Sequence, residues 1–180
     1  MPIVSTDIIF KLSITSGSAG NSLAQANANQ SLGKYISTSA IASGSLNNLY
    51  DNISGAENAA SNSDYRCIFV HNSHSTLTLQ AAVAWISAEV PGGADCFIGV
   101  DPAAASPIGQ SSNQAAAIGD ELTAPGGVTF TNPTTKSGGI VLGDIPPGQC
   151  KAIWMKRSAT NSTALSNDGA TVRVEGDTAA

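Results

Sequence analysis

The sequence is poor in charged and in aromatic side chains. Charged residues make up 12% and aromatic residues 5% of the 180 residues, whereas an average soluble domain is about 25% charged. The eight Lys and Arg residues are spread along the chain, and the formal net charge is −5 at pH 7. Nucleic acids and anionic lipid surfaces are bound by clustered basic side chains. We therefore expect neither nucleic acid nor a membrane as a partner.

The sequence also lacks a signal peptide, a membrane span and a disulfide framework. Residues 1–7 show no basic region followed by an apolar one, and no apolar run approaches about 18 residues. The cysteines are odd in number, and Cys67, Cys96 and Cys150 each lie inside an apolar segment. We expect them to be reduced core residues. These absences predict synthesis and folding in the cytoplasm.

The sequence contains many short segments with the pattern of β-strands. Apolar residues alternate with period two in residues 8–15, which is typical of a half-buried strand. Further segments, separated by Gly, Pro and Asn, predict strands at 65–71, 76–79, 82–90, 96–100, 128–131, 139–142, 149–157 and 171–175. The spacing favours an all-β fold, an antiparallel β-sandwich of the immunoglobulin-like or jelly-roll type.

Residues 149–157 have large apolar side chains on both faces. Cys150 and Trp154 fall on one face, and Ile153 and Met155 fall on the other. A strand covered on both faces is an inner strand of its sheet. The strand also carries three basic residues, Lys151, Lys156 and Arg157. Together with Arg173 they are interpreted as scattered solubilising charges, and the alternative is one modest basic strip if the two strands are neighbours.

Two turns suggest partners for this strand. Residues 144–148 contain Pro-Pro-Gly, which bends tightly because Pro presets φ and Gly accepts positive φ. We therefore expect residues 140–142 and 149–157 to be consecutive antiparallel strands. Asn-Asp-Gly at 167–169 similarly precedes residues 171–175 and offers a partner on the other side.

About fifty residues after the first strand are rich in Ser, Ala, Gly and Asn. Such a segment is too polar to form a core alone and unusually long for a connection. The pattern changes near residue 64. We therefore divide the chain into residues 1–64, an N-terminal strand plus an arm, and residues 65–180, the sandwich, within one folded unit.

A short helix is predicted inside the arm. Ser45 is a candidate N-cap and Gly55 follows the last apolar position. Four apolar residues between them follow the i, i+3, i+4, i+7 rule: Leu46, Leu49, Tyr50 and Ile53. Their stripe either packs on the sandwich or docks on a neighbouring subunit, so they are the candidate assembly contacts.

Motifs for catalysis or cofactor binding are missing. Cys67, His71 and His74 form the one cluster of potential metal ligands, but no fourth ligand is evident nearby. We expect His71 and Asn72 instead to satisfy backbone groups at a strand-ending corner. No Gly-x-Ser-x-Gly elbow and no phosphate-binding loop is present. We therefore predict a protein that is not an enzyme and has no catalytic, metal or cofactor site and no small-molecule substrate.

Several segments follow one another in a distinctive order. They are Ile-Ile-Phe-Lys-Leu-Ser at 8–13, Ser-Gly-Ser-Ala-Gly-Asn at 16–21, Tyr-Arg-Cys-Ile-Phe-Val-His-Asn at 65–72, Ile-Pro-Pro-Gly-Gln-Cys-Lys-Ala-Ile-Trp-Met-Lys-Arg at 145–157 and Arg-Val-Glu-Gly-Asp-Thr at 173–178. This order resembles that of virion structural proteins of tailed bacteriophages. The resemblance covers nearly the whole chain and is strongest to small capsid decoration, or cement, proteins.

This resemblance implies a β-rich, oligomeric protein without catalytic residues. Decoration proteins sit on the outer surface of the head and tie neighbouring major capsid subunits together. The expected partners are therefore the major capsid protein and copies of the chain itself. A tail or baseplate module that binds a receptor or glycan is the alternative, and it would need exposed aromatic side chains on one face.

Overall fold

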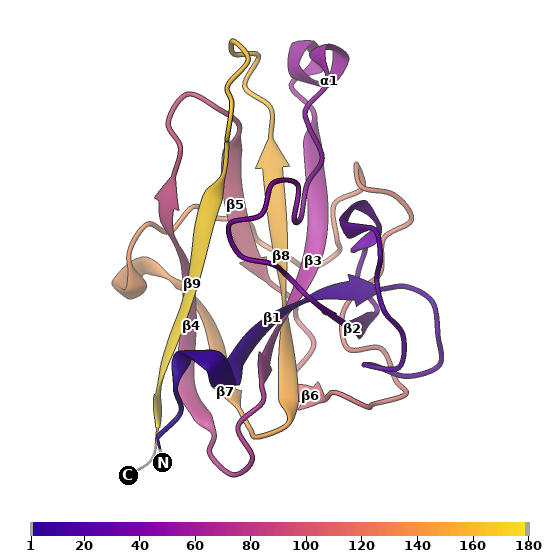
Figure 1. The fold of residues 1–180 in the computed structure, drawn as a ribbon, viewed down its shortest axis with the longest axis vertical. Coiled ribbons are helices and arrows are strands. Elements are labelled where there is room, and N and C mark those ends of the chain that lie inside the picture. Colours follow the sequence, from indigo (N-terminus) through magenta and orange to yellow (C-terminus); the bar gives the residue numbers. More distant parts are fainter. Residues whose placement is uncertain (1, 179–180) are drawn as a thin grey trace.

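The computed structural model describes residues 2–178, which form two antiparallel β-sheets packed face to face (Figure 1). The larger sheet has the order β2-β1-β3-β8-β5, and β6 also pairs with β8. Its strands are β1 Ile8–Ile14, β2 Tyr35–Ala40, β3 Ser63–Asn72, β5 Asp95–Val100, β6 Ser106–Pro107 and β8 Gln149–Ser158. The smaller sheet has the order β7-β4-β9, with β4 Leu79–Glu89, β7 Ile140–Ile145 and β9 Ala170–Thr178. The predicted all-β sandwich is confirmed.

Helical structure is short. The α-helix α1 spans Gly55–Ala60, and three 3-10 turns are η1 Ser5–Asp7, η2 Ala28–Gln30 and η3 Lys136–Gly138. Among the residues the structure describes, no helix is long and apolar enough to cross a membrane.

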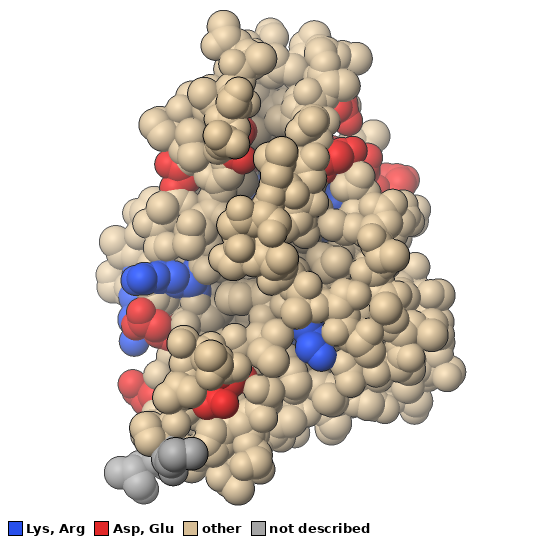
Figure 2. Space-filling model, viewed as in Figure 1, with Lys and Arg blue, Asp and Glu red and all other residues tan. Residues whose placement is uncertain are grey.

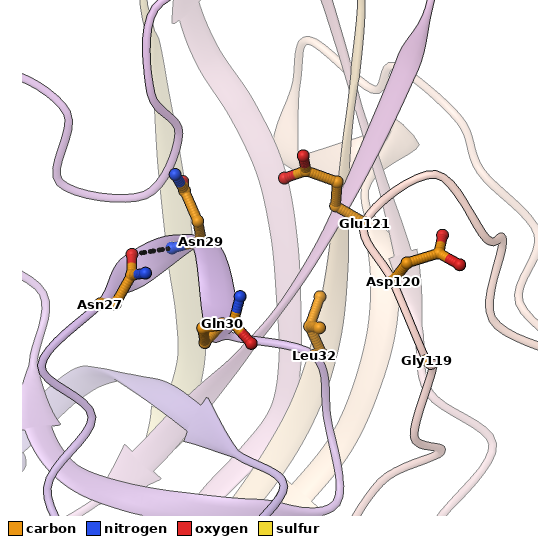
Figure 3. A pocket seen from close by; sticks show the side chains of 7 residues that line it. All are labelled: Asn27, Asn29, Gln30, Leu32, Gly119, Asp120 and Glu121. Atoms are coloured by element: carbon orange, nitrogen blue, oxygen red, sulfur yellow. Dashed lines mark hydrogen bonds between the residues drawn. The ribbon is translucent and has the colours of Figure 1, made fainter.

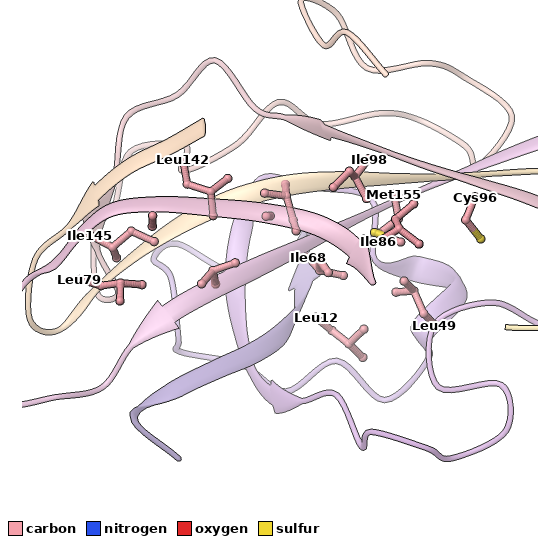
Figure 4. Close-up of a cluster of buried hydrophobic side chains, with 14 residues drawn as sticks. Leu12, Leu49, Ile68, Leu79, Ile86, Cys96, Ile98, Leu142, Ile145 and Met155 are labelled. Atoms are coloured by element: carbon pink, nitrogen blue, oxygen red, sulfur yellow. The ribbon is translucent and has the colours of Figure 1, made fainter. Parts of the chain in front are cut away.

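The main core lies between the two sheets (Figure 4). Ile68 of β3 and Ile153 of β8 face Ile86 of β4 and Ile145 of β7 across it, and all four are almost completely buried. Burying an aliphatic side chain of this size stabilises the fold by about 1.5–3 kcal/mol. This core holds the two sheets together.

A second core covers the opposite face of the large sheet. Phe69 of β3 and Trp154 of β8 are fully inaccessible there, and they pack with Leu32 and Ile36 from the N-terminal segment. Strand β8 lies between β3 and β5 and is therefore buried on both faces. The predicted inner strand at residues 149–157 is confirmed.

The structure does not show the predicted N-terminal arm, because this segment packs onto the large sheet. Residues 35–40 form the edge strand β2 of the large sheet, and Ser31 and Ser13 are completely buried. The Ser31 hydroxyl donates to the carbonyl of Cys67 at 2.6 Å and accepts from the Ser13 amide at 2.8 Å. A Ser-rich segment packs on the sheet because its short hydroxyls satisfy backbone groups that would otherwise be buried without partners.

The predicted hairpin between residues 140–142 and 149–157 is wrong. Strand β7 pairs with β4, whereas β8 pairs with β3 and β5 in the other sheet. Strand β9 likewise pairs with β4 and not with β8. The Pro-Pro-Gly turn is present, with φ +70° at Gly148, but it carries the chain from one sheet to the other. Period-two patterns specify faces, and they do not specify which strands pair.

The strand-ending corner of β3 is organised by Asn72. Its amide nitrogen donates to the carbonyls of Leu77 at 2.8 Å and Ile145 at 2.9 Å, and its amide oxygen accepts from the His74 backbone at 3.1 Å. The prediction that Asn72 satisfies backbone groups is confirmed. The side chain of His71 has no such role, because its buried Nδ1 has no hydrogen-bond partner.

Two predicted strands are largely absent from the described chain. Of residues 76–79, only Leu79 belongs to a strand, at the start of β4. Of residues 128–131, Thr131 makes an isolated bridge to Ile98 of β5. Cys67, Cys96 and Cys150 are all free and buried, as predicted.

Candidate functional site

The predicted assembly contacts lie in a loop and not in a helix. Residues 41–54 connect β2 to α1 without helical structure and cross the front of the molecule in Figure 1. Asn47 has a left-handed backbone (φ 55°), which interrupts a helix after its first residues. The helix begins at Gly55, because Ser54 and Glu57 form a capping box there. The prediction of a helix at 46–53 with Ser45 as its N-cap is therefore wrong.

The four candidate contacts have different environments. Leu46 is 72% exposed, whereas Leu49 is 9% exposed and belongs to the core between the sheets. Tyr50 and Ile53 are partly buried, and the Tyr50 hydroxyl is fully enclosed. The loop is thus anchored at Leu49 and Tyr50 and presents Leu46 to the outside.

Tyr50 makes cation–π contacts with two arginines. The guanidinium carbon of Arg157 lies 4.6 Å from the centroid of the Tyr50 ring, and that of Arg66 lies 5.2 Å from it. Such cation–π contacts contribute about 0.5–2 kcal/mol each, more where water is excluded. Burial raises the pKa of Tyr50 well above its usual value. Arg157 also donates to the backbone carbonyl of Asp51, so the chain on both sides of the ring is fixed.

The arginines are positioned by adjacent strands of the large sheet. Asp64 of β3 lies directly opposite Arg157 of β8 in the strand register. Its Oδ2 accepts from Nε of Arg157 at 3.0 Å and from Nη2 of Arg157 at 2.5 Å. Arg66, two residues along β3, is completely buried and bonds to Glu121 and to Asn29. Strand pairing therefore brings Asp64, Arg66 and Arg157 close together, and Asn29 and Glu121 from outside the strands complete the network.

The interpretation of all the basic residues of β8 as solubilising charges is wrong. Arg157 and Lys151 are 8% and 7% exposed. Lys151 donates from Nζ to the carbonyls of Asp101, at 2.8 Å, and Ala103, and burial lowers its pKa. Long side chains on a strand that is covered on both faces must find partners inside the protein.

Three carboxylates converge beside the arginines. One oxygen each of Glu57, Asp64 and Glu121 lies within 4.8 Å of the others, and this is the single group of potential metal ligands found in residues 2–178. Two of the three are already paired, Asp64 with Arg157 and Glu121 with Arg66. The helix cap at Ser54 lowers the pKa of Glu57. The group is accounted for as an ion-pair network without a metal.

The metal-ligand cluster considered from the sequence does not assemble in the described chain. Cys67 is fully buried, and burial raises the pKa of its thiol well above the usual value. Nδ1 of His74 accepts instead from the backbone amides of Thr76 and Leu77, at 3.1 and 3.0 Å. Burial, reinforced by the charge of Lys11, lowers the pKa of His71.

A shallow hollow of about 330 Å³ borders the arginine network (Figure 3). Its lining contains amide and carboxylate side chains and one large apolar residue: Asn27, Asn29, Gln30, Leu32, Gly119, Asp120 and Glu121. Small-molecule sites are predominantly apolar and enclose most of their ligand. This hollow has neither property, and the loop with its exposed Leu46 is the stronger candidate site.

Sequence reasoning missed the arginine anchor. Asp64 and Arg66 directly precede the most apolar stretch of β3, residues 67–70, and Arg157 ends the apolar part of β8. Charged residues of opposite sign inside two dense strand patterns were the available signal, because buried charges are normally paired.

No protein-family model, no curated protein and no solved structure matches this chain. The fold and the site therefore define the class of protein by themselves. The chain is an antiparallel β-sandwich that holds one loop in place through a buried arginine network.

Proposed function

We propose that this chain is a non-enzymatic structural protein of a tailed-phage particle, which binds the capsid shell as a decoration protein. The observation that carries the proposal is the exposure of Leu46 (72%) on a loop whose next residues are locked into the core. A loop held in one conformation loses little entropy on binding, so a single apolar side chain contributes more to affinity.

The surface around the loop is suited to many weak contacts. Figure 2 shows the same face as Figure 1, and it is mostly uncharged, with Lys, Arg, Asp and Glu in small separated groups. Neutral contacts of modest strength add up when they are repeated over a lattice. The partners that this role requires are the major capsid protein and neighbouring copies of the chain, on the outer surface of the head.

The proposal is tested with phage heads that lack the protein. The purified chain is mixed with these heads, sedimented and imaged by cryo-electron microscopy at subunit resolution. Density over the capsid lattice, with residues 41–54 at the contact, supports the proposal. Density at the tail alone would favour a receptor- or glycan-binding module, and binding to neither would contradict both roles.

A matched pair of leucines tests the loop itself. Leu46→Ser should weaken binding to heads about 10- to 100-fold, because burying a leucine stabilises a complex by about 1.5–3 kcal/mol. Leu122→Ser is the control, because Leu122 is also exposed, at 56%, but lies outside the loop. Equal effects of the two substitutions would show that residues 41–54 are not the contact.

A further inference from the structure

Strand β9 forms an open edge of the small sheet. It pairs with β4 from Ala170 to Thr178, and within residues 2–178 no other strand pairs with it. Figure 1 shows it as the long yellow strand. Its side chains alternate regularly: Val172 and Val174 pack against the core, whereas Arg173 and Glu175 are exposed. An unpaired edge of this length is a template for another strand.

Other edges of the sandwich are covered or interrupted. The edge of β2 is covered by residues 21–23. The Asn21 amide donates to the carbonyl of Ile36 at 2.6 Å, and the Leu23 carbonyl accepts from the Thr38 amide at 2.9 Å. Thr131 exchanges two backbone bonds with Ile98 of β5, at 2.8 and 2.9 Å. Strand β7 is only six residues long and contains Gly143 with φ +76°. The open edge of β9 is thus longer and more regular than these.

We propose that β9 pairs antiparallel with β9 of a second copy of this chain, in the register centred on Val174. In this register Arg173 lies opposite Glu175 of the partner subunit, and the two-fold axis repeats that pair. Val174 meets the partner's Val174 on the core side. The two small sheets then form one continuous sheet across the dimer, by the same strand addition that many recognition domains use.

The charge pattern selects this register over its neighbours. A register centred on Arg173 places Arg173 opposite the partner's Arg173, and one centred on Glu175 places Glu175 opposite the partner's Glu175. A shift by one residue pairs core-facing with solvent-facing side chains. The register centred on Val174 has two opposite-charge pairs and no like-charge pair. Lys136 of the same chain already contacts Glu175 at 3.3 Å, on a surface that leaves both side chains 48% exposed.

Charge reversal tests the pairing in solution. The wild-type chain should sediment as a dimer. Arg173→Glu or Glu175→Arg alone should raise the dimer dissociation constant at least about tenfold, because each makes two attractive cross-strand pairs repulsive. The double reversal should restore the dimer. Asp95→Lys, an exposed reversal on β5, should have no effect, and circular dichroism should show an unchanged fold in every variant.

Cysteine cross-linking tests the register. Only residue 174 meets itself across the two-fold axis, at a distance between strands that a disulfide can span. Val174→Cys should therefore cross-link two chains on mild oxidation, whereas Val172→Cys, which would face the partner's Gly176, should not. A monomeric wild type at all concentrations, a dimer that ignores the charge reversals, or equal cross-linking of the two variants would overturn the proposal. These readouts do not depend on whether the chain binds a capsid.

Discussion

The two sheets of the sandwich differ in how many of their faces are buried. Strands β3 and β8 of the large sheet are enclosed on both faces, and their side chains contribute to two separate cores. Strand β9 of the small sheet alternates between partly buried and exposed residues along its whole length. The large sheet therefore takes part in two cores, whereas the small sheet takes part in one and leaves an open edge at β9.

The charged residues follow the same division. In the large sheet, Arg66 and Arg157 are buried, paired with carboxylates and stacked on Tyr50. Beside the small sheet, Lys136 and Glu175 form an ion pair that is half exposed. A buried pair is costly to break because it leaves a charge without solvent, whereas an exposed pair is screened by water. Burial therefore decides how much the loss of one partner of each ion pair costs in stability.

The largest effect should come from the doubly buried strand. Trp154→Ala should lower the free energy of unfolding by about 3–5 kcal/mol, because it opens a cavity in the second core. It also removes the indole hydrogen bond to Asp101 (2.8 Å). Val172→Ala on β9 should cost about 1 kcal/mol or less, since that side chain is only partly buried. Urea denaturation measures the free energy of unfolding of both variants. Similar losses of stability would contradict the contrast between the doubly buried β8 and the half-exposed β9.

The next largest effect should come from the arginine network. Arg157→Met should destabilise the fold by about 3 kcal/mol, because Asp64 would remain buried without its partner. Asp64→Asn in the same chain should recover part of that loss. Lys136→Met, which breaks the exposed pair with Glu175, should change stability by about 0.5 kcal/mol or less. The free energy of unfolding of each variant is measured by urea denaturation. Equal losses for Lys136→Met and Arg157→Met would show that burial does not make one ion pair more important for stability than the other.

A smaller effect should appear with pH. The pKa of His71 is lowered in the folded protein from 6.5, first by burial and then by Lys11. As pH falls below 6.5, the His71 side chain of the unfolded chain takes up a proton while that of the folded chain stays neutral. The free energy of unfolding should therefore decrease on acidification. Melting temperatures of the wild type and of His71→Gln, measured across this range, should show a shallower loss in the variant. Parallel curves would rule out His71 as the source.

The smallest effect should come from the outer face of the small sheet. Val141 of β7 is 68% exposed, and Val141→Ser should change the free energy of unfolding by less than about 0.5 kcal/mol. Ile145→Val, four residues later in the same strand, should cost about 0.5–1.5 kcal/mol because Ile145 is completely buried. Chemical denaturation of the two variants tests whether β7 has one buried and one exposed face. A larger loss of stability for Val141→Ser than for Ile145→Val would contradict this assignment.

Much of the strand content follows from local patterns, and the site does not. The apolar alternation in β1 and the two apolar faces of β8 predicted a half-buried strand and an inner strand. Residues 41–54 form a loop, although Leu46, Leu49, Tyr50 and Ile53 have the spacing of a helical stripe. Their actual positions depend on where Leu49 reaches the core and where Tyr50 meets two arginines. Those arginines come from strands far away in the sequence.

By itself, the sequence determined an all-β sandwich, the positions of most strands and the burial of the free cysteines and of Trp154. These properties depend on hydrophobic periodicity, which is a local quantity. Tertiary structure alone decided that β7 and β8 belong to different sheets, that the Ser-rich segment packs on the large sheet, and that Arg66 and Arg157 anchor a loop. Each depends on which segments meet in space, where buried polar groups find partners that local sequence does not reveal.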